Sequence, residues 1–209
     1  MSAGISKEDM KAFQEAGISA YVEKPIQVTV LVNTLLTCIH NRSQLLEKQL
    51  AVANESSTKD ALTGVRNRTA YEHAEKRMNK EIAAGKSEPF ALLFCDVNNL
   101  KYTNDTYGHD RGDELIRSAC RMICDVFKHS TVFRVGGDEF AAILRGDDYD
   151  NRDALLARLA PSEAYGNVSV ACGLAVFDPA QDHDMSSVYK RADAAMYENK
   201  REMKSREDA

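Results

Sequence analysis

The chain has 209 residues, enough for one sizeable domain and a smaller unit, and its formal net charge is −5. This acidic balance, without a basic stripe, argues against a nucleic-acid-binding surface, so we expect no nucleic-acid partner. No apolar run is long enough to cross a bilayer and no secretory start is present, so we expect no membrane association.

The five cysteines are scattered through predicted helices and strands. Cys120 and Cys124 lie one helical turn apart, which is half of a metal-site pattern, but no second pair completes it. Buried free thiols in a reducing compartment are the expected state of these residues, and the expected location is cytoplasmic.

Residues 1–25 are predicted to form a short helix and then a strand. Ser6 caps the helix with Asp9 three residues later, Gly17 ends it, and the strand closes at Lys24-Pro25. The segment resembles the last part of a response-regulator receiver domain. The acidic cluster and phosphoacceptor aspartate of receivers belong to an earlier half, so we expect this partial receiver-like segment not to be phosphorylated.

Residues 26–58 are predicted to be a helical coiled-coil linker that ends in a short polar hinge at 55–59. Alternating spacings of four and three form a seam through residues 26–54: Val32, Leu36, Ile39, Ser43, Leu46, Leu50 and Ala53. This pattern predicts a homodimer through residues 26–54. An amphipathic helix that packs only on its own chain is the alternative.

Residues 59–209 are predicted to be one α/β (α+β) domain. We expect helices over 68–84, 112–127, 153–159 and 186–204, and strands over 90–97 and 168–177. A loop is expected between the first strand and the second of these helices. Strands and helices in this order predict a central sheet wrapped by helices.

A β-hairpin is predicted at Arg134–Phe140, with Gly136 and Gly137 in its turn because glycine takes positive φ without steric cost. Asp138 and Glu139 stand on this turn, where like charges repel unless a cation lies between them. Asp96 ends the buried strand over 90–97. If Asp96 and Asp138 meet, they form a hard-oxygen pocket suited to magnesium and to nucleotide chemistry.

The motif series of residues 60–204 resembles the GGDEF domain of diguanylate cyclases. The matching stretches are Asp60–Arg68, Asp96–Lys101, Asn104-Asp105, Tyr107–His109, Gly112-Asp113, Gly136–Phe140, Ala192-Asp193, Tyr197 and Lys200. The resemblance implies a palm-like, mostly antiparallel sheet wrapped by helices. It also implies an enzyme that condenses two GTP into cyclic di-GMP as a dimer, with release of two pyrophosphates.

The resemblance assigns the metal site and the reacting groups. Asp96, Asp138 and the Val97 carbonyl match the ligands of two Mg²⁺ ions per active site, for which Mn²⁺ is a plausible substitute. Glu139 matches an acid that either helps to bind metal or deprotonates the attacking 3′-hydroxyl. Lys101 matches a lysine that neutralises charge on the phosphates, although taken alone it would be an ordinary solvated lysine.

The resemblance also assigns the substrate contacts. Asn104 and Asp113 match the guanine readers, since a carboxylate accepts from guanine N1–H and N2–H together. His109 is either part of that pocket or a structural residue of the Gly-His turn. Lys200 and Lys204 match the cations that bind the triphosphate. Arg134 is expected to brace the acids of the hairpin.

The sequence departs from the family pattern at several positions. Asn98 and Leu100 replace an aspartate and an aromatic residue, and Met203 precedes Lys204 where the family has glycine and arginine. Phe127 and Ser130 stand where the family has the Arg-x-x-Asp of its product-inhibition site. We therefore expect no product inhibition through that site. The alternative to a cyclase is a catalytically silent GTP- or cyclic-di-GMP-binding dimerisation module.

Overall fold

The computed structural model describes residues 11, 15, 32–45 and 58–207. The chain divides into two units, Met1–Ser56 and Ser57–Ala209. Apart from Lys11 and Glu15, which are helical, the predicted receiver-like segment lies outside the described residues. The same holds for the later seam positions Leu46, Leu50 and Ala53 and for most of the hinge.

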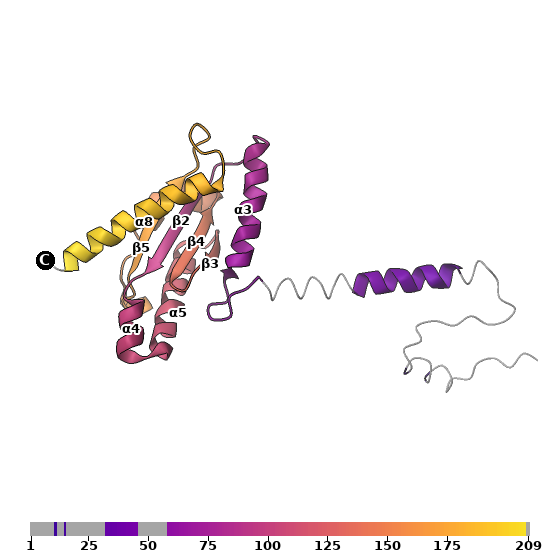
Figure 1. Ribbon diagram of the computed structural model, residues 1–209, viewed down its shortest axis with the longest axis horizontal. Coiled ribbons are helices and arrows are strands. Elements are labelled where there is room, and N and C mark those ends of the chain that lie inside the picture. Colours follow the sequence, from indigo (N-terminus) through magenta and orange to yellow (C-terminus); the bar gives the residue numbers. More distant parts are fainter. Residues whose placement is uncertain (1–10, 12–14, 16–31, 46–57, 208–209) are drawn as a thin grey trace, which may run out of the picture. The chain divides into compact units, whose positions relative to one another are not determined.

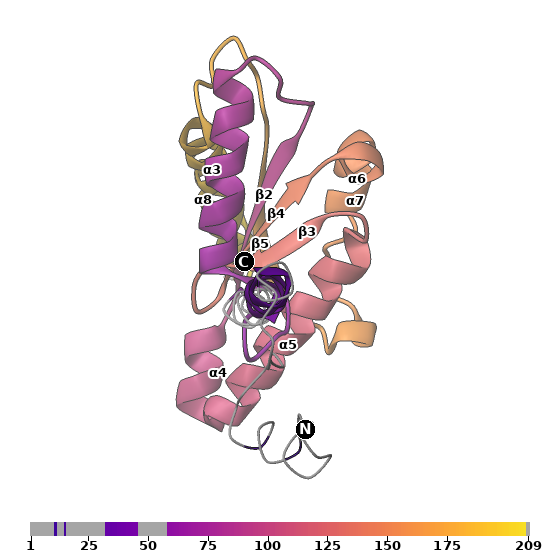
Figure 2. The same ribbon diagram turned by 90° about the vertical axis from the view of Figure 1, so that its right-hand side faces the viewer.

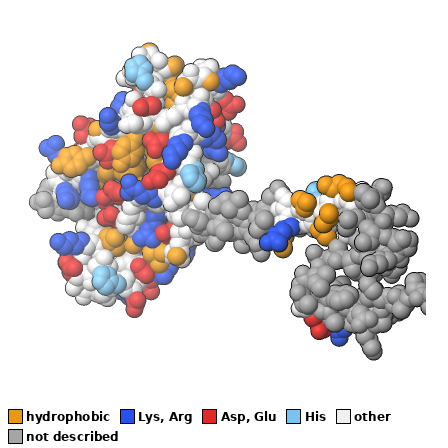
Figure 3. Space-filling view, turned by 45° about the vertical axis from the view of Figure 1, so that its right-hand side comes forward, with side chains coloured by type: hydrophobic (Ala, Val, Ile, Leu, Met, Phe, Trp, Pro, Cys, Tyr) orange, Lys and Arg blue, Asp and Glu red, His pale blue; other side chains and the backbone are white. Residues whose placement is uncertain are grey.

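In the first unit, residues 32–45 form a helix that leaves its apolar side chains uncovered. Val32 is 45% exposed, Leu36 58% and Ile39 66%. Orange apolar side chains gather on the visible face of this helix in Figure 3. Three consecutive positions of the predicted seam are therefore helical and unburied within one chain.

The second unit is built on a five-stranded sheet with the order β1-β3-β4-β2-β5 (Figure 1). The strands are β1 Arg66–Asn67, β2 Ala91–Val97, β3 Thr131–Arg134, β4 Glu139–Leu144 and β5 Val170–Val176. Only the short β1–β3 pair is parallel, and the pairs β3–β4, β4–β2 and β2–β5 are antiparallel. The prediction of a mostly antiparallel sheet wrapped by helices is confirmed.

Helices cover both faces of this sheet. They are α3 Arg68–Ala83, α4 Leu100–Tyr107, α5 His109–Val126, α6 Gly146–Asp150, α7 Arg152–Leu156, the 3-10 turn η1 Glu163–Tyr165 and α8 Met185–Glu207. Figure 2 shows α3 and α8 on one side of the strands and α5 on the other. Every residue of β2 is buried, which places this strand at the centre.

Successive side chains of a strand point to opposite faces, so β2 supplies two cores. Leu92 and Phe94 pack with α3 and α8. Leu93 and Cys95 pack with α5. The continuous apolar run before Asp96 is explained by this double coverage, which also sets Asp96 at the end of the most buried strand.

The segment after β2 differs from the prediction. A loop was expected there, but α4 occupies residues 100–107, and α5 begins at His109 rather than near Gly112. Helix α4 contains no buried residue, so its sequence carries no apolar period that would reveal it. The short elements β1 and α6 were not predicted, and α7 occupies residues 152–156, which is shorter than the helix expected over 153–159.

The predicted hairpin is present, but the reason given for its glycines is wrong. Arg134 pairs with Phe140, and the Val135 N–H donates to the Glu139 carbonyl over 2.9 Å. Neither Gly136 nor Gly137 has positive φ. A Cβ atom at Gly136 would instead collide with the carboxylate of Glu139. A side chain at 136 would therefore force the Glu139 carboxylate to move.

Candidate functional site

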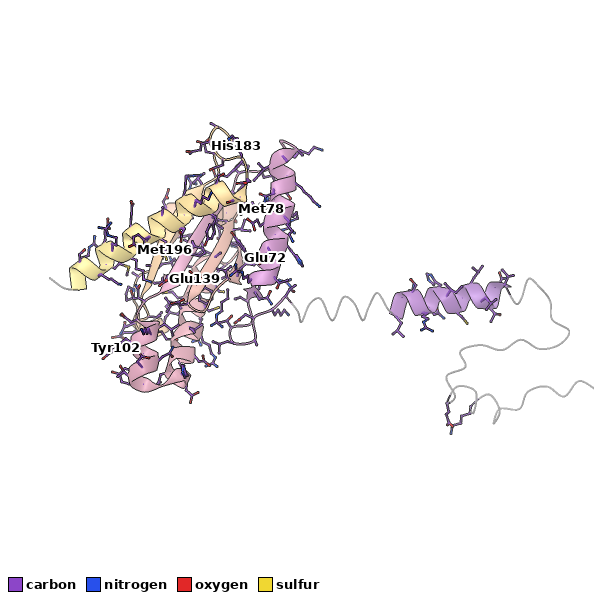
Figure 4. All side chains as sticks on the ribbon, in the orientation of Figure 1. Glu72, Met78, Tyr102, Glu139, His183 and Met196 are labelled. Carbon is purple, nitrogen blue, oxygen red and sulfur yellow. The ribbon has the colours of Figure 1, made fainter. Side chains whose placement is uncertain are left out.

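Three acidic side chains converge where β2 ends beside the hairpin turn. Asp96 pairs in register with Glu139, the first residue of β4. The N–H of the next residue, Val97, donates to the Asp138 carbonyl over 2.9 Å. Figure 4 shows Glu139 toward the end of the sheet nearest α4, the helix that carries Tyr102. The central sheet therefore brings together acids that lie some forty residues apart in the chain.

The surroundings of Glu139 carry an excess of negative charge, which is seen in the pKa of its carboxyl group. Burial raises the pKa of Glu139 above its ordinary value. Three nearby carboxylates raise this pKa further, those of Asp138, Asp96 and Asp193. Arg68 at the start of α3 acts in the opposite direction and does not cancel them. A site with this charge balance favours a bound cation.

The ammonium group of Lys200 is one cation already in place. Its Nζ lies 2.6 Å from Oδ1 of Asp96, and both side chains are largely buried. Lys200 is a predicted triphosphate ligand and Asp96 a predicted metal ligand. Here they neutralise each other, so a metal ion at Asp96 would have to compete with Lys200 for the same carboxylate oxygen.

Within the described part of the chain, no three histidine, cysteine or carboxylate side chains form a complete metal-ligand set. An incomplete set of protein ligands suits magnesium. This ion typically uses one or two protein carboxylates and fills its other positions with water and substrate phosphates. Asp96 and Asp138 can supply that share. The residues present therefore fit a magnesium–nucleotide complex better than a closed structural metal site.

A pocket of about 220 Å³ opens beside these acids. It is lined by Val97, Asn98, Asn99, Leu100, Lys101, Tyr102, Asp138, Lys200, Met203 and Lys204. Five of the predicted site residues thus border one cavity, three of them lysines. Lysines beside carboxylates provide both halves of a site for a metal-bound polyphosphate.

The predicted guanine readers lie apart from this pocket, on the helical hairpin α4–α5. The Asn104 side chain packs so closely on Gly112 that a Cβ atom there would collide with its Oδ1 atom. Asp113 follows directly, and its carboxylate lies 3.8 Å from Arg117. His109 is the exposed first residue of α5. The fold thus places Asn104 and Asp113 on adjoining helices, with His109 one turn before Asp113 on the surface of α5.

Arg134 braces the hairpin turn through a backbone carbonyl, and it forms its ion pair with Asp60 instead of with the hairpin acids. Its Nε and Nη2 donate to the Gly137 carbonyl over 3.2 and 2.7 Å, and Nη1 donates to both oxygens of Asp60. The N–H and hydroxyl of Thr63 also donate to Asp60. Asp60 thereby ties the N-terminal motif to the hairpin turn. Neither residue carries a local signal of this partnership.

Asp60 is held in its ionised form. Burial raises its pKa, but the hydrogen bonds from Thr63 and Arg134 and the charge of Arg134 outweigh burial and lower it. The Arg134–Asp60 pair is therefore electrostatically favourable, and it holds the backbone immediately before Asp138.

Two departures from the family pattern have structural counterparts. The Asn98 amide donates to the Ser169 hydroxyl over 2.9 Å, which joins the end of β2 to the segment before β5. Phe127 is only 1% exposed and belongs to the core under α5. A side chain in that position cannot reach a ligand, which supports the prediction that the usual product-inhibition site is lost.

No helix in the described ranges combines the length and apolarity that a bilayer crossing requires.

Comparison with known proteins identifies relatives of the second unit. A family model described as "Diguanylate cyclase, GGDEF domain" matches residues 57–206. The chain is 31% identical over 161 residues to the probable diguanylate cyclase DgcC of Escherichia coli, covering 72% of this chain and 42% of that protein. It is 29% identical over 190 residues to the E. coli diguanylate cyclase DgcM, covering 86% and 45%. The chain thus spans less than half of these curated relatives.

A crystal structure of the coiled coil and GGDEF domain of DgcB from Caulobacter crescentus, in complex with c-di-GMP, is similar in fold. The TM-score is 0.65 with 27% sequence identity, covering 81% of this chain and 94% of that one.

Proposed function

The chain belongs to the GGDEF family of diguanylate cyclases, and we propose that it condenses two GTP molecules into cyclic di-GMP with release of two pyrophosphates. The observation that carries this proposal is the convergence of Asp96, Asp138 and Glu139 beside a lysine-lined pocket. The whole chain's activity, substrate and partners are proposed on this basis, with residues 59–209 as the catalytic domain.

Asp96, Asp138 and the Val97 carbonyl would hold the divalent cations. We assign magnesium, two ions per site, with manganese as a substitute. A bound divalent cation neutralises the phosphates and polarises the phosphorus under attack. Glu139, whose pKa is raised by burial and by neighbouring acids, either accepts the proton of the 3′-hydroxyl or completes the cation's ligands.

The lysines of the pocket would hold the triphosphate. Lys200 and Lys204 are one turn apart on α8, and Lys101 faces the same cavity from α4. Lys200 would leave Asp96 for a phosphate oxygen when the cation takes its place. Lys204 offers a point charge rather than the bidentate fork of an arginine, so its grip on phosphate is less directional.

Base recognition would fall to the α4–α5 hairpin. Asn104 and Asp113 offer an amide and a carboxylate, the groups that complement guanine's Watson–Crick edge. The 3.8 Å contact of Asp113 with Arg117 is long enough to be given up to a ligand. His109 is assigned to the border of this base-binding region because it begins α5, one turn before Asp113.

Two catalytic domains must face each other, since each 3′-hydroxyl attacks the other nucleotide. We assign the dimer contact to residues 26–54 of the linker 26–58, with the receiver-like segment 1–25 before it. The uncovered apolar seam of the helix over 32–45 supports this assignment, as does the coiled coil of the DgcB relative. A coiled coil raises the effective concentration of the second half-site.

Incubation with GTP and magnesium, followed by chromatography of the nucleotides, tests the proposal. We expect the native chain to produce cyclic di-GMP. Asp138→Ala should produce it about a hundredfold more slowly, or slower still. Circular dichroism checks that this variant is folded. Asp147→Ala removes an exposed acid from α6 and should keep full turnover.

Undiminished turnover in Asp138→Ala would contradict the assignment of the site. Magnesium-dependent binding of GTP without any product from the native chain would instead support the catalytically silent module.

A further inference from the structure

Two cysteines on neighbouring strands lie in near contact beside the acidic site. Cys95 of β2 and Cys172 of β5 are register partners, and their Sγ atoms are 3.0 Å apart. Cys95 belongs to the core under α5, and Cys172 packs against that same core. Both side chains therefore lie on one face of the sheet and point toward each other.

The ladder around them shows that they form a non-hydrogen-bonded pair. The Phe177 N–H donates to the Phe90 carbonyl, and the Asn98 N–H donates to the Ser169 carbonyl, each over 3.0 Å. Hydrogen-bonded and non-hydrogen-bonded pairs alternate along antiparallel strands. Cys95 is an odd number of residues from both Phe90 and Asn98, so it falls on a non-hydrogen-bonded position.

This position brings the backbones close enough for a disulfide. Cα atoms of a non-hydrogen-bonded pair are about 4.5 Å apart, at the short end of the range of about 4.4–6.8 Å seen for disulfides. The Cys172 N–H consequently points away from β2 and donates to Oδ1 of Asn199 on α8, over 3.0 Å. The sulfurs need to approach by about 1 Å to reach bonding distance.

We propose that Cys95 and Cys172 are a redox modification site, which a hydroperoxide oxidises to a cross-strand disulfide that disturbs the neighbouring catalytic centre. Cys172 is the half-buried member and Cys95 is fully buried, so the oxidant reaches Cys172 first.

The oxidation of the two thiols to a disulfide takes two steps. The Cys172 sulfur attacks the hydroperoxide and the O–O bond breaks. The products are a sulfenic acid and an alcohol, or water when the oxidant is hydrogen peroxide. The Cys95 sulfur then attacks the sulfenic sulfur, the S–S bond forms, and water leaves with the remaining proton. Each sulfur loses one electron, and the two peroxide oxygens gain the pair.

The disulfide would affect the site through the chain neighbours of two site residues, Asp96 and Lys200. Cys95 precedes Asp96, and Asn199, which binds the Cys172 backbone, precedes Lys200. Forming the bond requires the sulfurs to approach by about 1 Å, and this movement falls on β2 and β5 next to Asp96. The ion pair between Asp96 and Lys200 joins the end of β2 to α8, the helix whose Asn199 binds Cys172. This consequence rests on the proposed function, whereas the thiol chemistry does not.

The test treats the full chain with hydrogen peroxide, blocks free thiols by alkylation and maps the peptides without reduction. We expect a peptide that links Cys95 to Cys172. Production of cyclic di-GMP should fall by about tenfold or more, because a shift of about 1 Å near reacting groups has effects of this size. Dithiothreitol should restore it.

Two variants sharpen the result. Cys172→Ser should resist the oxidant, whereas Cys124→Ser, which removes a thiol from α5, should respond like the native chain. Full alkylation of both thiols after oxidation, or oxidation of Cys172 that stops short of the link, would overturn the proposal. A link that leaves turnover unchanged would overturn its coupling to the site. If the reduced chain has no turnover at all, the proposed function fails while the peptide map still decides the thiol chemistry.

Discussion

Asp60 and Arg134 show how single residues far from the reacting groups set the geometry of the site. Arg134 holds the Gly137 carbonyl and pairs with Asp60, which is itself fixed by Thr63. Asp138 follows Gly137 directly in the chain. The position of a proposed metal ligand therefore depends on an ion pair between the start of the domain and the hairpin.

We expect Asp60→Asn to lower the free energy of unfolding by about 1–3 kcal/mol at neutral pH, because it leaves Arg134 without its charged partner. This corresponds to a fall in Tm of about 2–4 °C per kcal/mol. Thermal denaturation followed by circular dichroism measures it. Asp150→Asn removes an exposed carboxylate at the end of α6 and should leave Tm unchanged.

The same variant should show a characteristic pH dependence. The pKa of Asp60 is lowered in the folded state, so its contribution is present above the ordinary value of 3.8 and is lost as pH falls through the lowered value. The difference in Tm between the native chain and Asp60→Asn should therefore shrink below about pH 4. A difference that stays constant down to acid unfolding would contradict this account of Asp60.

Lys200 yields a second prediction at this scale. If Asp96 is the metal ligand proposed above, the ammonium group of Lys200 competes with the metal ion, so Lys200→Met should bind manganese more tightly without nucleotide, by about tenfold. Electron paramagnetic resonance of free manganese measures the affinity. Lys204→Met removes a charge from the same pocket without touching Asp96, and its effect should be smaller. Equal affinities in the native chain and Lys200→Met would show that the ion pair does not restrain the site.

At the scale of elements, the contact between β5 and α8 leaves no room for a side chain at Gly173. A Cβ atom at Gly173 would collide with the Ala192 carbonyl and the Met196 backbone, so the helix lies directly on the strand. This close approach also carries Lys200 and Lys204 to the end of β2. The glycine is required by space, since its φ is not positive.

Gly173→Ala should therefore push α8 from the sheet and cost about 1–3 kcal/mol in the free energy of unfolding. Urea denaturation monitored by circular dichroism measures the loss. Gly137→Ala is the matched control, because a Cβ atom there meets nothing within 4 Å and its φ is also not positive. If both variants unfold at the same urea concentration, α8 does not depend on this close contact.

For the whole molecule, the proposed reaction requires two chains. Ile39 is the most exposed apolar seam residue of the described helix. Ile39→Glu should place like charges on the seam, convert dimer to monomer and make turnover per chain depend on protein concentration. Light scattering and GTP turnover over a dilution series measure both effects.

Asn41→Glu adds the same charge to the same helix off the seam, and it should remain dimeric. A monomeric Ile39→Glu with full, concentration-independent turnover would contradict the role assigned to the coiled coil.

The sequence alone determined the main elements and the chemical character of the site. The apolar run of β2, the hairpin and the long helices leave periodic or local signals, because each buries a face or needs a turn. Helix α4 left no such signal, since it buries no residue and is held by its neighbour α5.

Only the tertiary structure decided which charged and sulfur groups meet. Asp96 and Lys200 are 104 positions apart, Cys95 and Cys172 77, and Asp60 and Arg134 74. Contacts at such separations follow from strand order and helix packing, and neither has a local trace in the residues that make them. The spacing of the motifs predicted the kinds of group at the site. The packing of strands and helices determined that Lys200 pairs with Asp96 and Arg134 with Asp60.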